Sequence, residues 1–216
     1  KNYCNDKVVF FSFSSKSSLA KDCVFLLNFF PKNELSELLL YLNEDSKVAL
    51  LYPENEYGYL INSFIDDLIF ESPAILVNRS SYKDDLSNVR DAIKELGKYK
   101  LRKYELSRQK QILSSKKDEK SKKRLKKLER FKTTSDYDFT HILIADYGLN
   151  LLQVAPLLPY YDIDPNIVQF MGTGVIDDKT FFYEPSLQGA IFPGVPETRR
   201  INIINNYMEI YDEEFL

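Results

Sequence analysis

Short apolar runs alternate with amphipathic segments along most of this chain of 216 residues. The runs at residues 48–51, 74–77 and 141–145 are continuous rather than alternating, which is typical of strands covered on both faces, and residues 168–171 also read as a strand. Between them, apolar residues recur at helical spacing, for example Leu35, Leu38, Leu39 and Leu42 after Asn33, the expected N-cap. Strands that alternate with helices predict an α/β fold with a parallel sheet flanked by helices.

The stretch from residue 47 to 58 is the clearest strand, loop and helix start in the chain. The run at 48–51 ends near Pro53, and Tyr57-Gly58 opens a helical segment. The expected inward face of that helix consists of Leu60, Ile61, Phe64, Ile65, Leu68 and Ile69. Parallel sheets bind ligands beyond the carboxyl ends of their strands, so the loop at 52–58 is the first place to expect a site.

Two later strand ends resemble this loop. Residues 141–145 run into Asp146-Tyr147-Gly148, and residues 168–171 run into Gly172-Thr173-Gly174. Ser14 follows a first apolar run at residues 8–13, which also reads as a buried strand. We therefore expect a cleft for a small polar ligand formed by Ser14, Tyr57, Tyr147 and Thr173. The alternative is that both tyrosines only cover the core and that Gly58 and Gly148 serve tight turns.

Charge is strongly local in this sequence. The chain has a net charge of −3, yet residues 98–132 contain 16 Lys or Arg against 4 Asp or Glu, which makes this segment +12 and the remainder −15. We expect two antiparallel helices with a turn near residues 114–118. The segment is either a solvated projection or a surface that docks to phosphate, anionic lipid or an acidic protein, with Lys122, Lys123, Lys126 and Lys127 as the expected docking residues. Nucleic acid is not an expected partner, because residues 116–130 contain no aromatic residue for base stacking.

Several kinds of chemistry lack the residues they need. The single histidine, His141, opens a strand, and no G-x-S-x-G motif occurs, so no catalytic residue is predicted. Two cysteines that are far apart and one histidine do not form a zinc site, and Gly172-Thr173-Gly174 is neither a dinucleotide fingerprint nor a P-loop. No metal and no cofactor are predicted. No apolar run approaches the roughly 20 residues of a membrane-spanning helix.

The two ends of the chain leave further expectations. A helix from about Glu197 should turn Ile201, Ile204, Met208 and Tyr211 inward. Cys4 and Cys23 allow one disulfide but also fit two small buried thiols. The chain begins without Met and without a signal peptide, and we expect it to be a fragment or processed form that lacks any targeting segment.

The order of several motifs resembles the type I periplasmic-binding-protein fold and, within it, the bacterial penicillin-binding-protein activator family, which is related to branched-chain amino-acid-binding proteins. The motifs are LYPEN at 51–55 with YG at 57–58, LLPYYD at 157–162, QFMGTG at 169–174 and EPSLQG at 184–189. The resemblance implies two α/β lobes around a cleft, with residues 1–30 as a remnant of the first lobe, residues 31–189 as the second and residues 190–216 returning to the first. The first strands and the closing helices of the first lobe are not matched, so the chain is expected to be truncated at both ends.

The resemblance also implies a function. It points to a non-enzymatic binding domain of the cell envelope that activates a peptidoglycan synthase by protein contact, located in the periplasm or on the outer membrane as a lipoprotein. The alternative is a substrate-binding protein of an amino-acid ABC transporter. Transporter members grip the ammonium and carboxylate of an amino acid with groups at positions matching Ser14, Tyr57, Tyr147 and Thr173. Residues 172–175 contain no carboxylate that would take the ammonium.

Overall fold

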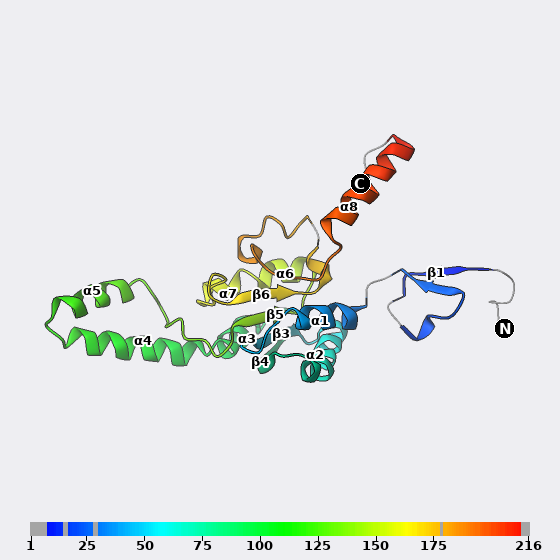
Figure 1. Ribbon diagram of the computed structural model, residues 1–216. Helices are drawn as coiled ribbons and strands as arrows, with labels where there is room; N and C mark the ends of the chain where they lie inside the picture. Colours follow the sequence, from blue (N-terminus) through cyan, green and yellow to red (C-terminus); the bar gives the residue numbers. More distant parts are fainter. Residues whose placement is uncertain (1–7, 15–16, 28–29, 178, 213–216) are drawn as a thin grey trace.

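A four-stranded parallel sheet lies at the centre of the molecule. The structure is a computed structural model that describes residues 8–14, 17–27, 30–177 and 179–212. The order of the sheet is β4 (Ile75–Tyr82), β3 (Lys47–Pro53), β5 (His141–Ile144) and β6 (Gln169–Gly172), with every pair parallel. Residues on β3, β5 and β6 lie in register, with Leu50 beside Leu143 and Leu143 beside Met171. The α/β fold with a parallel sheet is confirmed (Figure 1).

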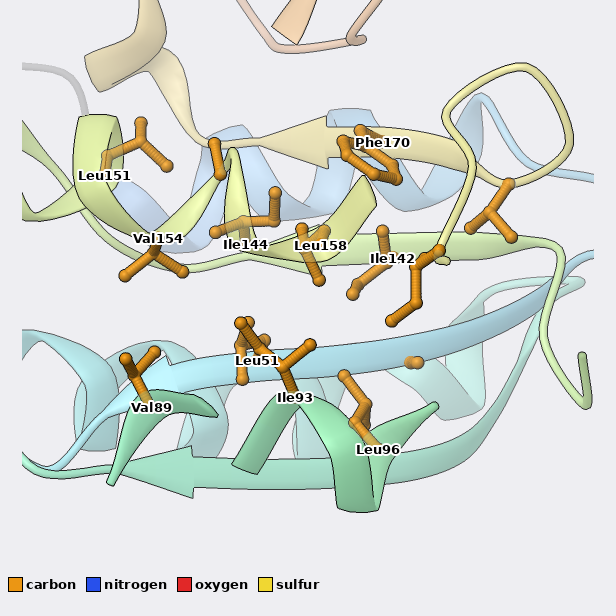
Figure 2. Close-up of a cluster of buried hydrophobic side chains, with 14 of the residues drawn as sticks. Leu51, Val89, Ile93, Leu96, Ile142, Ile144, Leu151, Val154, Leu158 and Phe170 are labelled. Carbon is orange, nitrogen blue, oxygen red and sulfur yellow. The ribbon is translucent and has the colours of Figure 1, made fainter. Parts of the chain in front are cut away.

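Helices cover both faces of this sheet. Helices α1 (Pro31–Leu40) and α2 (Glu56–Leu68) pack on one face, and α3 (Val89–Leu96), α6 (Gly148–Val154) and α7 (Leu157–Tyr160) pack on the other. Successive residues of a strand point to opposite faces, so Leu50 joins Leu35 and Ile61 in one core while Leu51 joins Ile93 in the other. Figure 2 shows the second core. Burial on both faces explains why β3 and β5 read as continuous apolar runs. The expectation of two covered faces is wrong for β4, an edge strand in which Ile75 is 52% and Val77 is 38% exposed.

The boundaries of three elements differ from the expectation. Helix α1 begins at Pro31 rather than after Asn33, because proline suits the first helical position, where no backbone donor is needed. Helix α2 begins at Glu56, and its Leu60 is exposed, so the predicted apolar face was too wide. Strand β4 continues beyond the apolar run at residues 74–77, through polar residues to Tyr82, because its ladder with β3 extends to Pro53.

A second, two-stranded parallel sheet pairs β1 (Phe10–Ser12) with β2 (Val24–Leu26), and a 3-10 turn, η2 (Ser17–Leu19), lies between them. The prediction of a buried first strand is wrong for the described residues: Phe11 is 65% and Phe13 is 79% exposed. Two strands alone do not cover both of their faces, so these side chains reach solvent. Cys23 is disulfide-bonded, which excludes the free-thiol alternative for this residue, whereas Cys4 lies outside the described residues.

After β6 the chain forms an irregular segment and a final helix. The turns η4 (Gly174–Ile176) and η5 (Pro185–Leu187) precede a parallel bridge between Met171 and Ile191, and α8 (Glu197–Tyr211) follows. None of the residues of α8 is buried, so the predicted inward face of Ile201, Ile204, Met208 and Tyr211 is wrong. Figure 1 shows why: α8 projects from the sheet, and the described part of the chain places no core against its apolar side.

The basic segment forms a helical hairpin, as predicted. Helices α4 (Tyr99–Ser114) and α5 (Glu119–Leu128) pack against each other and are joined by a short turn. Outside the hairpin, the 3-10 turn η3 (Ile69–Glu71) follows the end of α2. Figure 1 shows the hairpin projecting away from the sheet, on the opposite side from β1. No helix in the described part of the chain is both long enough and apolar enough to span a membrane.

Candidate functional site

Three of the four predicted ligand-binding residues meet at one edge of the central sheet. Tyr57 lies in the first turn of α2 after β3, Tyr147 lies between β5 and α6, and Thr173 follows β6. The Tyr57 hydroxyl and Thr173 Oγ1 are 2.6 Å apart and share a hydrogen bond. The Tyr57 and Tyr147 rings meet edge to face, with centroids 5.1 Å apart and an interplanar angle of 86°. We call this group the hydroxyl cluster.

The sheet topology produces the cluster. Strands β3, β5 and β6 are parallel neighbours, so their carboxyl ends share one edge, and the residues that follow them are brought together. Glycine permits the close approach of α2 to β3: a Cβ on Gly58 would lie 1.9 Å from the Pro53 carbonyl oxygen. Asn55 caps the same turn, with its Oδ1 accepting from the Gly58 N–H at 2.9 Å. The position of Tyr57 is therefore fixed by its two neighbours in the turn, the capping residue Asn55 and the closely packed Gly58.

Burial keeps the cluster neutral. Thr173 is fully buried, and burial is the main reason why the pKa of Tyr57 rises to about 12, although its hydrogen bond with Thr173 acts in the opposite direction. The nearby carboxylates of Glu34 and Asp146 raise the pKa of Tyr57 further. Tyr147, by contrast, is 48% exposed. The cluster thus combines the protonated phenol of Tyr57, held in place by Thr173, with the solvent-exposed ring of Tyr147.

Asp146 and Tyr82 form a buried hydrogen-bonded pair next to the cluster. Asp146 is buried at the end of β5, where its Oδ2 accepts from the Tyr82 hydroxyl at 2.5 Å and its Oδ1 accepts from the Tyr147 N–H at 2.8 Å. Burial raises the pKa of Asp146. Sequence reasoning missed this pair, although Asp146 directly precedes the predicted Tyr147. The signal was an acidic residue at the end of a fully apolar strand, which needs a buried partner.

Glu34 brings a carboxylate to the loop at Thr173 from a distant part of the chain. Its Oε2 accepts from the Gly174 N–H at 3.2 Å, across 140 positions of sequence. A cavity of about 390 Å³ adjoins this contact and is lined by Phe30, Asn33, Glu34, Glu37, Gly174, Asp177 and Pro193 to Val195. We call it the acidic cavity. Sequence reasoning looked for this carboxylate within residues 172–175 and missed Glu34, because helical spacing alone does not show which residue of α1 faces β6.

The structure does not bring the remaining predicted residues to this edge. Ser14 follows β1 in the two-stranded sheet, where its backbone N–H donates to Ser12 Oγ at 3.2 Å. The four predicted docking lysines are exposed on α5, and Lys122 forms an ion pair with Glu119 at 3.1 Å. Both predictions remain open.

The arrangement suits binding by hydrogen bonds and ring contacts. His141 lies at the amino end of β5, the opposite end of the strand from the cluster, and its Nδ1 shares a hydrogen bond of 2.7 Å with Thr140 Oγ1. Burial lowers the pKa of His141. Within the described residues, no group of three or more His, Cys, Asp or Glu side chains is placed to hold a metal ion. Tyrosine and threonine hydroxyls both donate and accept hydrogen bonds, so the cluster suits a small polar ligand.

Comparison with known proteins shows the fold. No family model and no curated protein matches the chain. Solved structures do match: a substrate-binding periplasmic protein from Ralstonia solanacearum (TM-score 0.54, 13% identity, 96% of this chain and 52% of that one) and an ABC-type branched-chain amino acid transporter from Rhodopseudomonas palustris (TM-score 0.56, 7% identity, 96% and 48%). A solute-binding protein of an ABC transporter from R. palustris, in complex with benzoate, also matches (TM-score 0.54, 9% identity, 89% and 44%).

These matches establish the type I periplasmic-binding-protein-like fold. The chain spans about half the length of the solved proteins. Two of the three proteins are named as parts of ABC transporters and none as a penicillin-binding-protein activator, so the finer resemblance inferred from the sequence motifs is not established.

Proposed function

We propose that this chain provides one ligand-contacting lobe of a solute-binding protein that serves an ABC transporter. The observation that carries the proposal is the meeting of Tyr57, Tyr147 and Thr173 at the shared carboxyl edge of β3, β5 and β6. Ligands of open α/β sheets bind at this edge. The fold shared with solute-binding proteins supports the same class of function.

In this proposal the ligand is an amino acid or a related small polar molecule with an amine. Glu34 and Asp146 make the surroundings of Tyr57 electronegative, which disfavours an anionic group against the cluster. Glu34, held beside the loop after Thr173, is the group expected to attract an ammonium. Tyr147 would cover the apolar part of the ligand with its exposed ring.

The proposal also includes a second lobe. Residues 31–189 would form the lobe described above, while residues 1–30 and 190–216 would belong to the other, from which Ser14 would face the ligand. The protein would be periplasmic and would bind without turnover, as expected for the class of its structural neighbours. Activation of a peptidoglycan synthase is the less supported function, because the two R. palustris proteins named above are ABC-transporter proteins.

Ligand titration of the chain tests this function. Amino acids, simple amines and benzoate are added while backbone amide shifts are followed by NMR, which detects weak binding to a single lobe. We expect saturable shifts at Tyr147 and Gly174 for a ligand that carries an amine. A ligand at a hundred times its Kd also stabilises the fold by about 2.7 kcal/mol.

One variant tests the site and a second variant serves as its control. Tyr147→Ala should abolish the shifts, whereas Tyr183→Ala, at a tyrosine that is 88% exposed and outside the cluster, should leave them unchanged. Shifts that saturate equally in both variants, or that map to residues away from 57, 147 and 173, contradict the proposed site.

A further inference from the structure

The end of the helical hairpin is densely cationic. We call residues 116–130 the basic tip: it contains nine basic and three acidic residues. All nine basic side chains are exposed, namely Lys116, Lys117, Lys120, Lys122, Lys123, Arg124, Lys126, Lys127 and Arg130. Two of the three carboxylates are engaged within the tip, since Asp118 accepts from the Ser121 N–H at 2.9 Å and Glu119 pairs with Lys122. Most of the positive charge therefore faces solvent.

The tip sits on a rigidly held base. Arg102 of α4 is 2% exposed, and its guanidinium donates to the Gly97, Thr134, Tyr161 and Asp162 carbonyl oxygens and to Thr133 Oγ1. The same group lies 4.6 Å from the centre of the Tyr137 ring. An ion pair between Lys98 and Asp138 also lies at this base. These contacts tie the start of α4 to the segment after α5 and to the loop before β6, so the base of the hairpin is anchored to the sheet domain.

The two helices pack through a narrow apolar seam. Leu106 of α4 is buried, and Leu125 and Leu128 of α5 are half-buried, whereas the lysines of α5 occupy its other sides. Just before the turn, Ile112 is 47% exposed. The tip therefore combines cations on several faces with an exposed apolar residue, Ile112, in the last turn of the neighbouring helix α4.

The residue types distinguish among anionic partners. Seven of the nine cations are lysines, which act as hydrated point charges, whereas fixed recognition of carboxylates uses the bidentate fork of arginine. Lysine is also depleted in protein–protein interfaces, where aromatic residues are enriched, and the tip contains no aromatic residue. Clusters of four to eight lysines or arginines are instead typical of segments attracted to anionic membrane surfaces.

We propose that the basic tip docks to the surface of an anionic phospholipid membrane. The lysines supply long-range attraction to phosphate headgroups, and Ile112 lies where it can enter the headgroup boundary. This role goes beyond the proposed ligand binding and involves different residues. It would hold the lobe beside the membrane that contains its transporter.

Vesicle sedimentation of the whole chain tests the proposal. The probes are vesicles of phosphatidylcholine alone and vesicles in which about a third of the lipid is phosphatidylglycerol. We expect binding to the anionic vesicles only, weakened when salt rises from about 0.05 to 0.5 M, because the Debye length shortens severalfold over that range. A variant with Lys122, Lys123, Lys126 and Lys127 changed to Gln should lose affinity by at least about tenfold, since each lysine near an anionic surface contributes to the attraction.

A matched control separates the tip from net charge. Changing Lys21, Lys47, Lys83 and Lys179 to Gln alters the net charge by the same amount at exposed positions outside the hairpin, and this variant should bind as the parent does. Glutamine keeps helix propensity close to that of lysine, and circular dichroism verifies that α5 persists. Equal loss in both variants, equal binding to both vesicle types, or binding to duplex DNA or an acidic protein without binding to vesicles would overturn the proposal.

Discussion

The Tyr57 hydroxyl and Thr173 Oγ1 lie 2.6 Å apart, although 116 positions separate the two residues in the chain. Their hydrogen bond joins the turn after β3 to the loop after β6, over the end of β5. Thr173 is completely buried, so its hydroxyl depends on this partner. The contact therefore couples the stability of the sheet edge to the geometry of the candidate site.

Removal of this hydrogen bond should cost measurable stability. Tyr57→Phe leaves the buried Thr173 hydroxyl unpaired, and we expect a loss of about 1 to 3 kcal/mol in the free energy of unfolding, measured with urea. Thr173→Val removes the other partner, and the double variant should show a coupling of about 1 kcal/mol. Tyr183→Phe, at an exposed tyrosine, is the control. Strict additivity of the two single changes would show that the contact contributes nothing.

The same tyrosine predicts a pH dependence. In the folded state the pKa of Tyr57 is about 12, above its ordinary value of 10.0, so the folded state holds the phenolic proton more tightly than the unfolded state does. The resulting stabilisation is complete below pH 10 and is lost as the pH rises from about 10 to 12. The stability difference between the parent and Tyr57→Phe should shrink over that window. A difference that stays constant from pH 9 to 12 would contradict the raised pKa.

Arg102 should be the most sensitive position of the hairpin. Arg102→Gln leaves several carbonyl oxygens without their donor, and we expect a loss of about 3 kcal/mol or more, with faster hydrogen exchange along α4. Arg108→Gln on the same helix is exposed and should change stability by less than about 0.5 kcal/mol. Arg102→Lys should not restore stability, because an ammonium cannot reach all of these acceptors. Equal stability of the three variants would exclude the role of Arg102 as the anchor of the hairpin base.

The two Tyr-Gly pairs should respond differently to alanine. A Cβ on Gly58 would overlap the Pro53 carbonyl oxygen, so Gly58→Ala must push α2 away from β3 and should cost about 2 kcal/mol or more. Gly148 has φ +57° and open space where a Cβ would lie, so Gly148→Ala should cost only about 1 to 2 kcal/mol, and Gly148→Asn less. Thermal unfolding of the three variants gives the order. A milder effect for Gly58→Ala would show that α2 shifts freely.

Much of the fold could be predicted from local patterns. Continuous apolar runs marked β3 and β5 because both faces of these strands are buried, and the charge pattern with its break marked the hairpin. The rule that parallel strands share a carboxyl edge was enough to select Tyr57, Tyr147 and Thr173 and to place them together. These features depend on periodicity and on strand direction, which the order of residues itself determines.

Other features were decided only by tertiary packing. Glu34 reaches Gly174 across 140 positions, and Asp146 meets Tyr82 through the pairing of β3 with both β4 and β5, so neither contact has a local signal. The apolar face of α8 looks like a core face in the sequence, yet it is exposed because burial depends on a neighbouring layer. The two Tyr-Gly pairs are identical in sequence, yet Gly58 permits close packing against the Pro53 carbonyl whereas Gly148 adopts a left-handed conformation. Such differences arise from contacts between distant segments, which periodicity does not encode.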